Sequence, residues 1–419
     1  MKFIDNIPEE KYERFVSKHK QKSHFMQSYC WGEVMKNKNF NPHYVGLEKD
    51  GNLVATALLL EKKVFKNISY FYCPRGYVMD YSNLDLLKIF TQELKKYAKR
   101  NNAMYIKIDP DVKRHTLDID GNIIEGEENS KLMNELINLG YKHKGFNTDF
   151  VNEQPRFTFR LNLEDDFENI YSRMHATTRK ILNKQNQYNL DTYIGNIEDI
   201  KDFYITMQET AKRDGLICSP IKYYESFYSI LNKNNMSDLY VVKVNIDSLK
   251  KIYTDKIKDL ENKIKDLESK KEGNKQKTEN KINEYKNEIT KQMKDFDIVN
   301  KINEKEVILS SIITVKYNDK VWTIHGGNTT ELRHLNSNYW LYYTIIKDAH
   351  EQGYKIIDFF GTSGNANPDK NDSIYGIHNF KKRLGGEYIE FIGEYDLIVN
   401  KFMYFIYNKL KPIYRKLKK

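Results

Sequence analysis

The sequence predicts a mixed α/β protein in which one unit of strands and helices occurs twice and a helical arm interrupts the second copy. Strand and helix patterns recur in the same order in the two halves of the chain. A segment of roughly 60 residues with helical periodicity separates two strands of the second half, far more than an ordinary loop. We therefore predict a first domain over residues 1–147, a second over 148–245 and 305–419, and an arm over 246–304.

The first unit begins with a β-hairpin. Apolar and polar residues alternate over residues 43–60 around Lys49-Asp50-Gly51-Asn52, a turn sequence with a glycine where positive φ is favoured. The next predicted elements are a strand over Phe71–Tyr77, a helix over about Asp85–Lys99 and a strand from Ala103 to Asp109. This order of hairpin, strand, helix and strand defines the repeating unit.

The second unit repeats the order. Strands are predicted over Leu239–Asn245, Val307–Val315 and Val321–His325, followed by a helix over about Tyr339–Gln352 and a strand over Lys355–Phe360. Asp109 and Asp358 then occupy corresponding places, near the C-terminal ends of the strands that follow the two helices. Two copies of one mixed α/β unit are favoured over a single large sheet.

The interrupting segment has the pattern of two helices. Apolar residues recur at spacings of three and four up to Leu267, the sequence Glu272-Gly273-Asn274 breaks the pattern, and the spacing resumes from Ile282. Lys, Glu, Asp and Asn occupy most of the other positions. We predict an antiparallel two-helix coiled coil with its tip at Gly273, whose apolar stripe forms the core of the arm before it forms a binding surface.

Composition favours anionic partners and a reducing compartment. The 68 Lys and Arg residues exceed the 58 Asp and Glu residues, giving a net charge of +10. Such a charge favours nucleic acid, phosphorylated substrates or an acidic membrane, and compositional bias toward Lys is the alternative explanation. Cys30, Cys73 and Cys218 are widely spread, so neither a disulfide framework nor a metal site is expected. The N-terminal residues lack the pattern of a signal peptide, and we expect a cytoplasmic protein.

The duplicated unit resembles the GNAT acyltransferase fold, whose common members use acetyl-CoA, and we expect two tandem GNAT-like domains. Those enzymes need a glycine-rich turn at a helix N-terminus, where backbone N–H groups hold the pyrophosphate of CoA. Neither copy has such a turn between strand and helix, and the residues before Gly326-Gly327 do not fit that motif. Walker-type loops, metal motifs and a nucleophile elbow are also absent from the sequence. An acyl donor other than CoA is favoured, with no metal and no bound cofactor.

Several segments carry a more specific resemblance. They are residues 25–36 (FMQSYCWGEVMK), 72–76 (YCPRG) with Asp80-Tyr81, 210–215 (TAKRDG), 375–386 (YGIHNFKKRLGG) and 393–395 (GEY). Together they resemble the Fem/MurM family of tRNA-dependent peptidoglycan aminoacyltransferases over nearly the whole chain, and the block around Phe380-Lys381 is the most specific. Many members of this family carry a helical arm in the second domain.

The resemblance implies a reaction. Aminoacyl-tRNA would be the co-substrate, and the side-chain amine of the third stem residue, a lysine or a diamino acid, would attack its ester in lipid II or a nucleotide-linked (UDP) muropeptide precursor. An ester is already activated, so the enzyme mainly aligns two anionic substrates and stabilises an oxyanion. The alternatives are another GNAT-fold acyltransferase, with acyl-CoA or a different acceptor, and a non-catalytic tRNA-binding protein.

The resemblance also implies catalytic residues. Lys381 is expected to stabilise the oxyanion and Phe380 to shape the pocket. The alternative for Lys381 is a solvated helix lysine beside Lys382. Asp109 matches an aspartate that has been considered as the base for the attacking amine, although Pro110 beside it equally suggests the end of a strand.

Other residues are expected to contact substrate. Lys36 matches a position that contacts the precursor phosphates, and Tyr395 is either a pocket hydroxyl or a half-buried aromatic. Arg75 either binds substrate or fixes the loop on which it lies. Ile217-Cys218-Ser219 stands where a basic residue is expected, and Arg213 or Arg179-Lys180 are candidates to supply that charge.

The C-terminal residues 401–419 combine large apolar side chains with seven basic residues. The segment is too short and too charged to cross a bilayer, but a basic amphipathic helix can lie in an anionic interface. We expect peripheral contact with the inner face of the cell membrane, and the alternative is a helix packed on the second domain with a frayed tail. A monomer and a homodimer are both compatible with the sequence.

Overall fold

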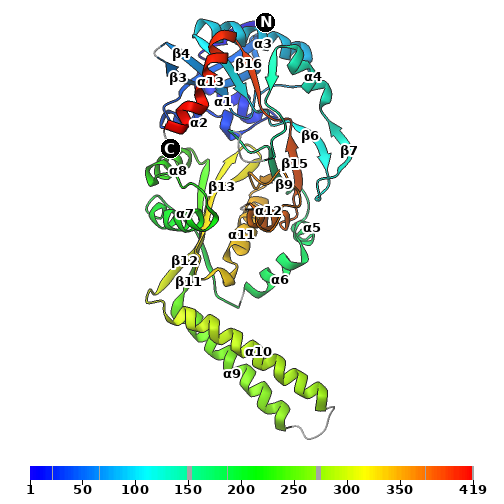
Figure 1. The fold of residues 1–419 in the computed structure, drawn as a ribbon, viewed down its shortest axis with the longest axis vertical. Helices are drawn as coiled ribbons and strands as arrows, with labels where there is room; N and C mark the ends of the chain where they lie inside the picture. Colours follow the sequence, from blue (N-terminus) through cyan, green and yellow to red (C-terminus); the bar gives the residue numbers. More distant parts are fainter. Residues whose placement is uncertain are drawn as a thin grey trace.

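The computed structural model describes residues 1–20, 22–65, 67–148, 153–185, 187–269, 275–372 and 374–417. Two β-sheets with helices packed around them form the body, and a helical hairpin extends from one end of it (Figure 1). The mixed α/β class predicted from the sequence is confirmed. Among the described residues, no helix is both long enough and apolar enough to cross a membrane.

The first sheet contains the predicted hairpin and the strand predicted to follow the helix at about Asp85–Lys99. Its strands, in spatial order, are β1 (Lys2–Asp5), β2 (Asn41–Lys49), β3 (Asn52–Phe65), β4 (Ile68–Cys73), β5 (Ala103–Ile108), β16 (Tyr395–Ile398) and β8 (Tyr141–His143). Asp50 and Gly51 both have positive φ in the β2–β3 turn, which matches the right-handed twist of the two strands. Helix α3 (Leu84–Arg100) connects the parallel strands β4 and β5.

The second sheet repeats this arrangement. Its strands, in spatial order, are β10 (Asp191–Gly195), β11 (Ser237–Asn245), β12 (Glu306–Tyr317), β13 (Lys320–Asn328), β14 (Ile356–Asp358), β9 (Phe157–Asn162), β15 (Glu387–Phe391), β6 (Lys113–Leu117) and β7 (Ile123–Glu128). Helix α11 (Ser337–Glu351) connects the parallel strands β13 and β14, as α3 connects β4 and β5.

The two sheets exchange strands across the predicted boundary between the domains, and the division of the chain into domains stays a prediction. Strand β16 follows the second unit in sequence but pairs with β5 and β8 in the first sheet. Strands β6 and β7 lie within residues 1–147 but extend the second sheet beyond β15. The boundaries that we predicted therefore do not coincide with the sheets. Periodicity identifies a strand but not its partner, because pairing is a tertiary interaction.

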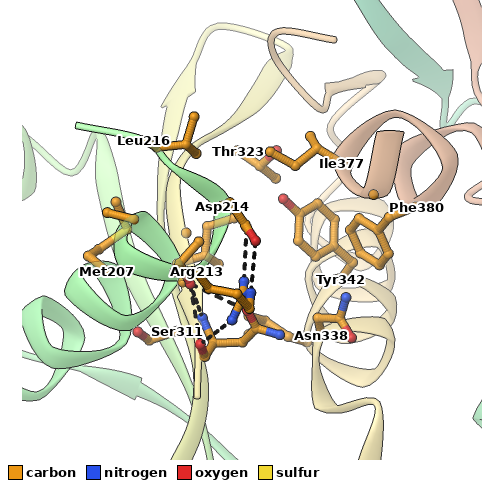
Figure 2. Close-up of a pocket in the computed structure, with 18 of the residues that line it drawn as sticks. Met207, Arg213, Asp214, Leu216, Ser311, Thr323, Asn338, Tyr342, Ile377 and Phe380 are labelled. Atoms are coloured by element: carbon orange, nitrogen blue, oxygen red, sulfur yellow. Dashed lines mark hydrogen bonds and ion pairs between the residues drawn. The ribbon is translucent and has the colours of Figure 1, made fainter. Parts of the chain in front are cut away.

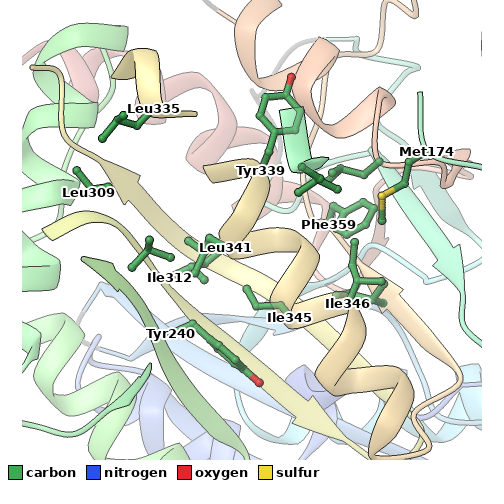
Figure 3. Close-up of a cluster of buried hydrophobic side chains, with 14 of the residues drawn as sticks. Met174, Tyr240, Leu309, Ile312, Leu335, Tyr339, Leu341, Ile345, Ile346 and Phe359 are labelled. Atoms are coloured by element: carbon green, nitrogen blue, oxygen red, sulfur yellow. The ribbon is translucent and has the colours of Figure 1, made fainter. Parts of the chain in front are cut away.

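The remaining helices cover the sheets and the junction between them. They are α1 (Glu9–Lys18), α2 (Tyr29–Lys36), α4 (Ser130–Asn138), α5 (Phe167–Arg173), α6 (Ala176–Gln185), α7 (Ile200–Asp214), α8 (Ile221–Lys233), α12 (Tyr375–Lys382) and α13 (Lys401–Leu417), with the 3-10 turns η1 (Phe25–Gln27) and η2 (Arg333–Leu335). Leu341 and Ile345 of α11 lie toward Ile312 and Tyr240 of the second sheet, and Ile346 lies beside Phe359 (Figure 3). This packing fixes the start of α11, which borders the candidate site.

The predicted arm consists of helices α9 (Ile246–Ser269) and α10 (Lys275–Asn300), which lie side by side (Figure 1). Leu249, Tyr253 and Val299 are buried at its base, in the core of the second unit. The predicted tip at Gly273 lies outside the described residues, and coiled-coil packing of the stripe stays a prediction. Asn245 and Glu306 pair across β11 and β12, so both ends of the arm leave the sheet at the same place.

Candidate functional site

A pocket of about 390 Å³ lies in the second unit, between α7, the β12–β13 hairpin, α11 and α12. Tyr342 and Phe380 face Arg213 and Asp214 across it (Figure 2). Lys381 also lines it. The structure thus brings together three of the predicted site residues, Arg213, Phe380 and Lys381.

Phe380 forms part of the pocket wall. Its ring makes edge-to-face contacts with Tyr339 and Tyr342 of α11, with centroids 4.9 and 4.8 Å apart. Such contacts add to the burial of apolar area and fix the orientation of the ring. Helix α12 therefore presents Phe380 to the pocket in one defined position beside Lys381.

Lys381 is a buried amine held by backbone carbonyl groups. Its Nζ donates hydrogen bonds to the carbonyl oxygens of Phe360, at 2.8 Å, and Gly361, at 2.7 Å. Burial lowers the pKa of Lys381 to about 7, and the negative charge of Asp358 acts in the opposite direction. An ammonium group has three N–H bonds, so two carbonyl partners leave one N–H for a substrate oxygen in the pocket.

The carbonyl group of Phe360 is held in place by Asp358. Phe360 has a φ of 56°, which is unfavourable for a bulky side chain. Oδ1 of Asp358 accepts hydrogen bonds from the backbone N–H of Phe360, at 2.8 Å, and from Oγ1 of Thr158, at 2.5 Å. Oδ2 of Asp358 accepts from Nε of Arg160 at 2.7 Å. Asp358 therefore stabilises the backbone conformation that orients one acceptor toward Lys381.

His378 is a structural residue of the site that sequence reasoning missed. Its side chain is fully buried, with Nδ1 2.9 Å from Oγ1 of Thr362 and Nε2 2.9 Å from the carbonyl oxygen of Ala366. Burial lowers its pKa, which favours the neutral ring. The imidazole thus fastens the loop after β14 to α12. A signal was present, because His378 precedes Lys381 by three residues and lies one helical turn away.

Arg213 lies in the pocket wall with its guanidinium already engaged. It forms two bonds with the carboxylate of Asp214, at 2.8 and 3.0 Å, and donates to Oδ1 of Asn328 at 3.0 Å. Arg179, the other candidate for the missing charge, donates to the carbonyl oxygens of Ser172 and Met174 at the end of α5. Both guanidiniums thus bind groups of the protein next to them. Direct contact of either with substrate stays a prediction.

Asp109 and Arg75 lie outside this pocket, beside a cavity of about 10 Å³. The carboxylate of Asp109 accepts hydrogen bonds from the Tyr72 hydroxyl, at 2.7 Å, and from the backbone N–H of Arg75, at 2.5 Å. Burial raises the pKa of Asp109 to about 7, against the charge of Arg75. Arg75 has a φ of 60° and donates to the carbonyl oxygen of Pro155. These contacts favour the structural alternative, in which both residues fix the loop after β4.

Lys36 and Tyr395 are also separate from the pocket. Lys36 is exposed at the end of α2, where its Nζ lies 2.6 Å from Oε1 of Glu33. Tyr395 is fully buried in β16 and packs against the ring of His143. The side chain of Tyr395 therefore belongs to the core of the first unit. This position supports neither the pocket hydroxyl nor the half-buried aromatic expected from the sequence. Whether Lys36 binds substrate stays a prediction.

The model of the FemAB family matches residues 7–412. The chain belongs to the FemAB family. The resemblance inferred from the sequence blocks is thereby confirmed, and the match covers the pocket, the arm and every strand of the two sheets except β1.

Individual FemAB relatives agree with this assignment. A lipid II:glycine glycyltransferase of Staphylococcus haemolyticus (strain JCSC1435) is 28% identical over 416 residues, which cover 97% of this chain and 95% of the relative. Another, from Staphylococcus aureus (strain bovine RF122 / ET3-1), is 29% identical over 424 residues with the same coverage. The crystal structure of FemX matches with a TM-score of 0.76 and 27% identity, and covers 97% of this chain and 99% of FemX. The predicted enzyme class, an aminoacyltransferase, is confirmed by these glycyltransferase relatives.

Proposed function

We propose that this FemAB protein transfers an amino acid from aminoacyl-tRNA to the side-chain amine of the third stem residue of lipid II, and that glycine is the amino acid. The observation that carries the proposal is Lys381, a buried amine with one N–H left for a ligand in a pocket of the second unit. The named acceptor and amino acid of the relatives support the choice of substrates. The cytoplasm is the proposed location.

The chemistry follows from the ester. The neutral acceptor amine attacks the carbonyl carbon of the aminoacyl ester, a C–N bond forms, and the carbonyl oxygen becomes an oxyanion. Collapse of this intermediate breaks the C–O bond, and the tRNA leaves as its terminal hydroxyl after taking up the proton lost by the amine. The ammonium of Lys381 stabilises the oxyanion, and its two carbonyl partners hold it in place for that purpose.

A transfer assay tests the proposal. The protein is incubated with lipid II and glycyl-tRNA, and the acceptor is analysed by mass spectrometry for one added glycine. Parallel reactions replace lipid II by its nucleotide-linked precursor or by a peptide with a free N-terminus, and replace glycyl-tRNA by other aminoacyl-tRNAs or acetyl-CoA. Glycine on lipid II supports the proposal. Product only with acetyl-CoA or only with the peptide identifies another acyltransferase, and tRNA binding without any product identifies a binding protein.

The arm is proposed as a contact for the tRNA. Replacing residues 257–294 by a short turn is expected to raise the Kd for aminoacyl-tRNA about tenfold, because an arm rich in lysine would otherwise neutralise phosphates. Cutting there keeps Leu249, Tyr253 and Val299 in the core, so the body is expected to fold. Filter binding measures the Kd, and an unchanged unfolding midpoint is the control for folding. An unchanged Kd would remove the arm from the tRNA interface.

Helix α13 is proposed as a peripheral membrane contact. Phe402, Phe405 and Leu410 are exposed on it, while Tyr404 is buried and its hydroxyl donates to Asp396 at 2.8 Å. One face of the helix is thus anchored to the body, while exposed apolar side chains remain available to a lipid surface. We expect the protein to float with vesicles that contain anionic lipid, and removal of residues 401–419 to reduce that fraction severalfold. Equal flotation of both forms would contradict a membrane role for this helix.

A further inference from the structure

The charged side chains of the pocket differ in how they are engaged. Among its described lining residues, Arg213 and Asp214 form an ion pair with each other, and Lys381 donates to two backbone carbonyl groups. Arg333 also lines the pocket and is exposed, and its guanidinium forms no hydrogen bond or ion pair within the described part of the chain. A guanidinium in this situation is suited to bind a phosphate group through two parallel hydrogen bonds.

The segment that carries Arg333 connects the pocket to the base of the arm. His334 follows Arg333, and its Nε2 lies 2.9 Å from the hydroxyl of Tyr253 on α9. The carbonyl oxygen of Leu335 accepts a hydrogen bond from Nε2 of Gln185 on α6, at 2.6 Å. Asn338, near the start of α11, lines the pocket again. Turn η2 is therefore fixed from the arm side and presents Arg333 on the pocket side.

Further cations lie where the arm meets the body. Lys184, Lys256 and Lys291 are close enough to interact electrostatically, and the ammonium of Lys256 lies 4.6 Å from the centroid of the Tyr188 ring. Glu288 and Asp295 are the acidic neighbours in this group. Lys291 and Asp295 also interact with His334, next to Arg333. A mixed group of three lysines and two acidic residues therefore lies at the base of the arm, next to the turn that carries Arg333.

We infer that Arg333 binds a phosphate of the donor tRNA close to its aminoacylated end, and that this end enters the pocket from the arm side. The inference rests on the proposed function and names the group of the donor that this part of the site recognises. The last phosphodiester of a tRNA is one nucleotide away from the ester, so it can lie at the rim of the pocket that contains Lys381. The phosphates of the acceptor are separated from its reacting amine by a sugar and part of the peptide stem.

Steady-state kinetics of Arg333→Ala test the inference. The KM for aminoacyl-tRNA is expected to rise about tenfold with little change in kcat, as for loss of one charged hydrogen-bonding partner. The slope of log affinity against log salt, measured by filter binding, is expected to become shallower by about 0.7, the value for one phosphate of a single strand. Aminoacyl-adenosine without a phosphate should react equally with both proteins. Lys347→Ala, which removes an exposed lysine of α11 outside the pocket lining, is the matched control for net charge.

Other outcomes separate the inference from the proposed function. A wild-type protein that uses aminoacyl-tRNA, together with an Arg333→Ala variant that has the same KM and salt slope, overturns only the inference. The inference alone is also overturned when Arg333→Ala raises the KM for lipid II instead of the KM for aminoacyl-tRNA. The same conclusion follows when the substitution slows the reaction with aminoacyl-adenosine as much as the reaction with aminoacyl-tRNA. A wild-type protein that uses no aminoacyl-tRNA overturns the proposed function and the inference with it.

Discussion

Lys381→Ala is expected to reduce kcat for aminoacyl transfer by about 100- to 1000-fold, the usual effect of removing one donor to an oxyanion. The ammonium of Lys381 is buried, positioned by Phe360 and Gly361, and has one N–H left for the pocket. Because this interaction exists mainly in the transition state, the KM for aminoacyl-tRNA should change little. Single-turnover transfer to lipid II measures the effect.

Lys382→Ala is the matched control for this substitution. Lys382 is the next residue of α12, but its Nζ is directed to Asp120, at 2.8 Å, and to Asn367, at 3.1 Å. Its loss should leave kcat within about twofold of the wild-type value, because a contact at the protein surface contributes little. A Lys381→Ala protein that is folded and nearly as active as wild type would rule out the oxyanion role.

The pH profile gives a second measurement of the same role. Only the charged form of Lys381 stabilises an oxyanion, and its pKa is lowered by burial to about 7. The charged fraction falls as pH rises through about 7, so kcat should decrease on the alkaline side. Asp358→Asn retains an acceptor for the N–H of Phe360 but removes the negative charge that raises the pKa of Lys381, so the decrease should move to lower pH. Identical curves of kcat against pH for wild type and Asp358→Asn would contradict the assignment of the alkaline decrease to Lys381.

Arg160→Ala is expected to lower the free energy of unfolding by about 3–5 kcal/mol, the range for breaking a buried ion pair by removing one partner. Nη2 of Arg160 lies 2.8 Å from Oδ2 of Asp111, and its Nε lies 2.7 Å from Oδ2 of Asp358. Asp111 follows β5 of the first sheet, whereas Arg160 and Asp358 belong to the second, so the guanidinium connects the two units. Without it, two largely buried carboxylates lose their shared partner. Urea unfolding followed by circular dichroism measures the change.

The effect of Arg160→Ala should depend on pH. The Arg160 guanidinium holds the pKa of the Asp111 carboxyl well below its usual range, against the effect of burial. A lowered pKa stabilises the fold above the unfolded value of about 4, and this stabilisation is lost as pH falls toward the folded value. The difference in free energy of unfolding between wild type and Arg160→Ala should therefore become smaller as the pH falls below about 4.

Arg173→Ala is the control for this substitution. It removes an exposed ion pair with Asp165 and should lower the free energy of unfolding by at most about 1 kcal/mol. Equal unfolding midpoints for Arg160→Ala and wild type would refute the bridging role.

Much of the site could be found from the sequence where the signal was local. The block around Phe380-Lys381 predicted both residues, and the pocket contains them together with Arg213. Arg333 had no such signal, because its place at the pocket depends on η2 being bonded to the arm and to α6. Asp109 and Arg75 matched a pattern, yet their contacts place them beside a separate small cavity at the loop after β4.

The sequence by itself determined the order of elements, because periodicity and turn residues are local. It predicted the β2–β3 hairpin at Asp50-Gly51, the helices before β5 and β14, and the two helices of the arm. Only the tertiary structure decided that β16 joins the first sheet and that β6 and β7 join the second. It also decided that Lys381 is buried against two carbonyl groups. Strand partners and burial depend on contacts between distant residues, which no local pattern specifies.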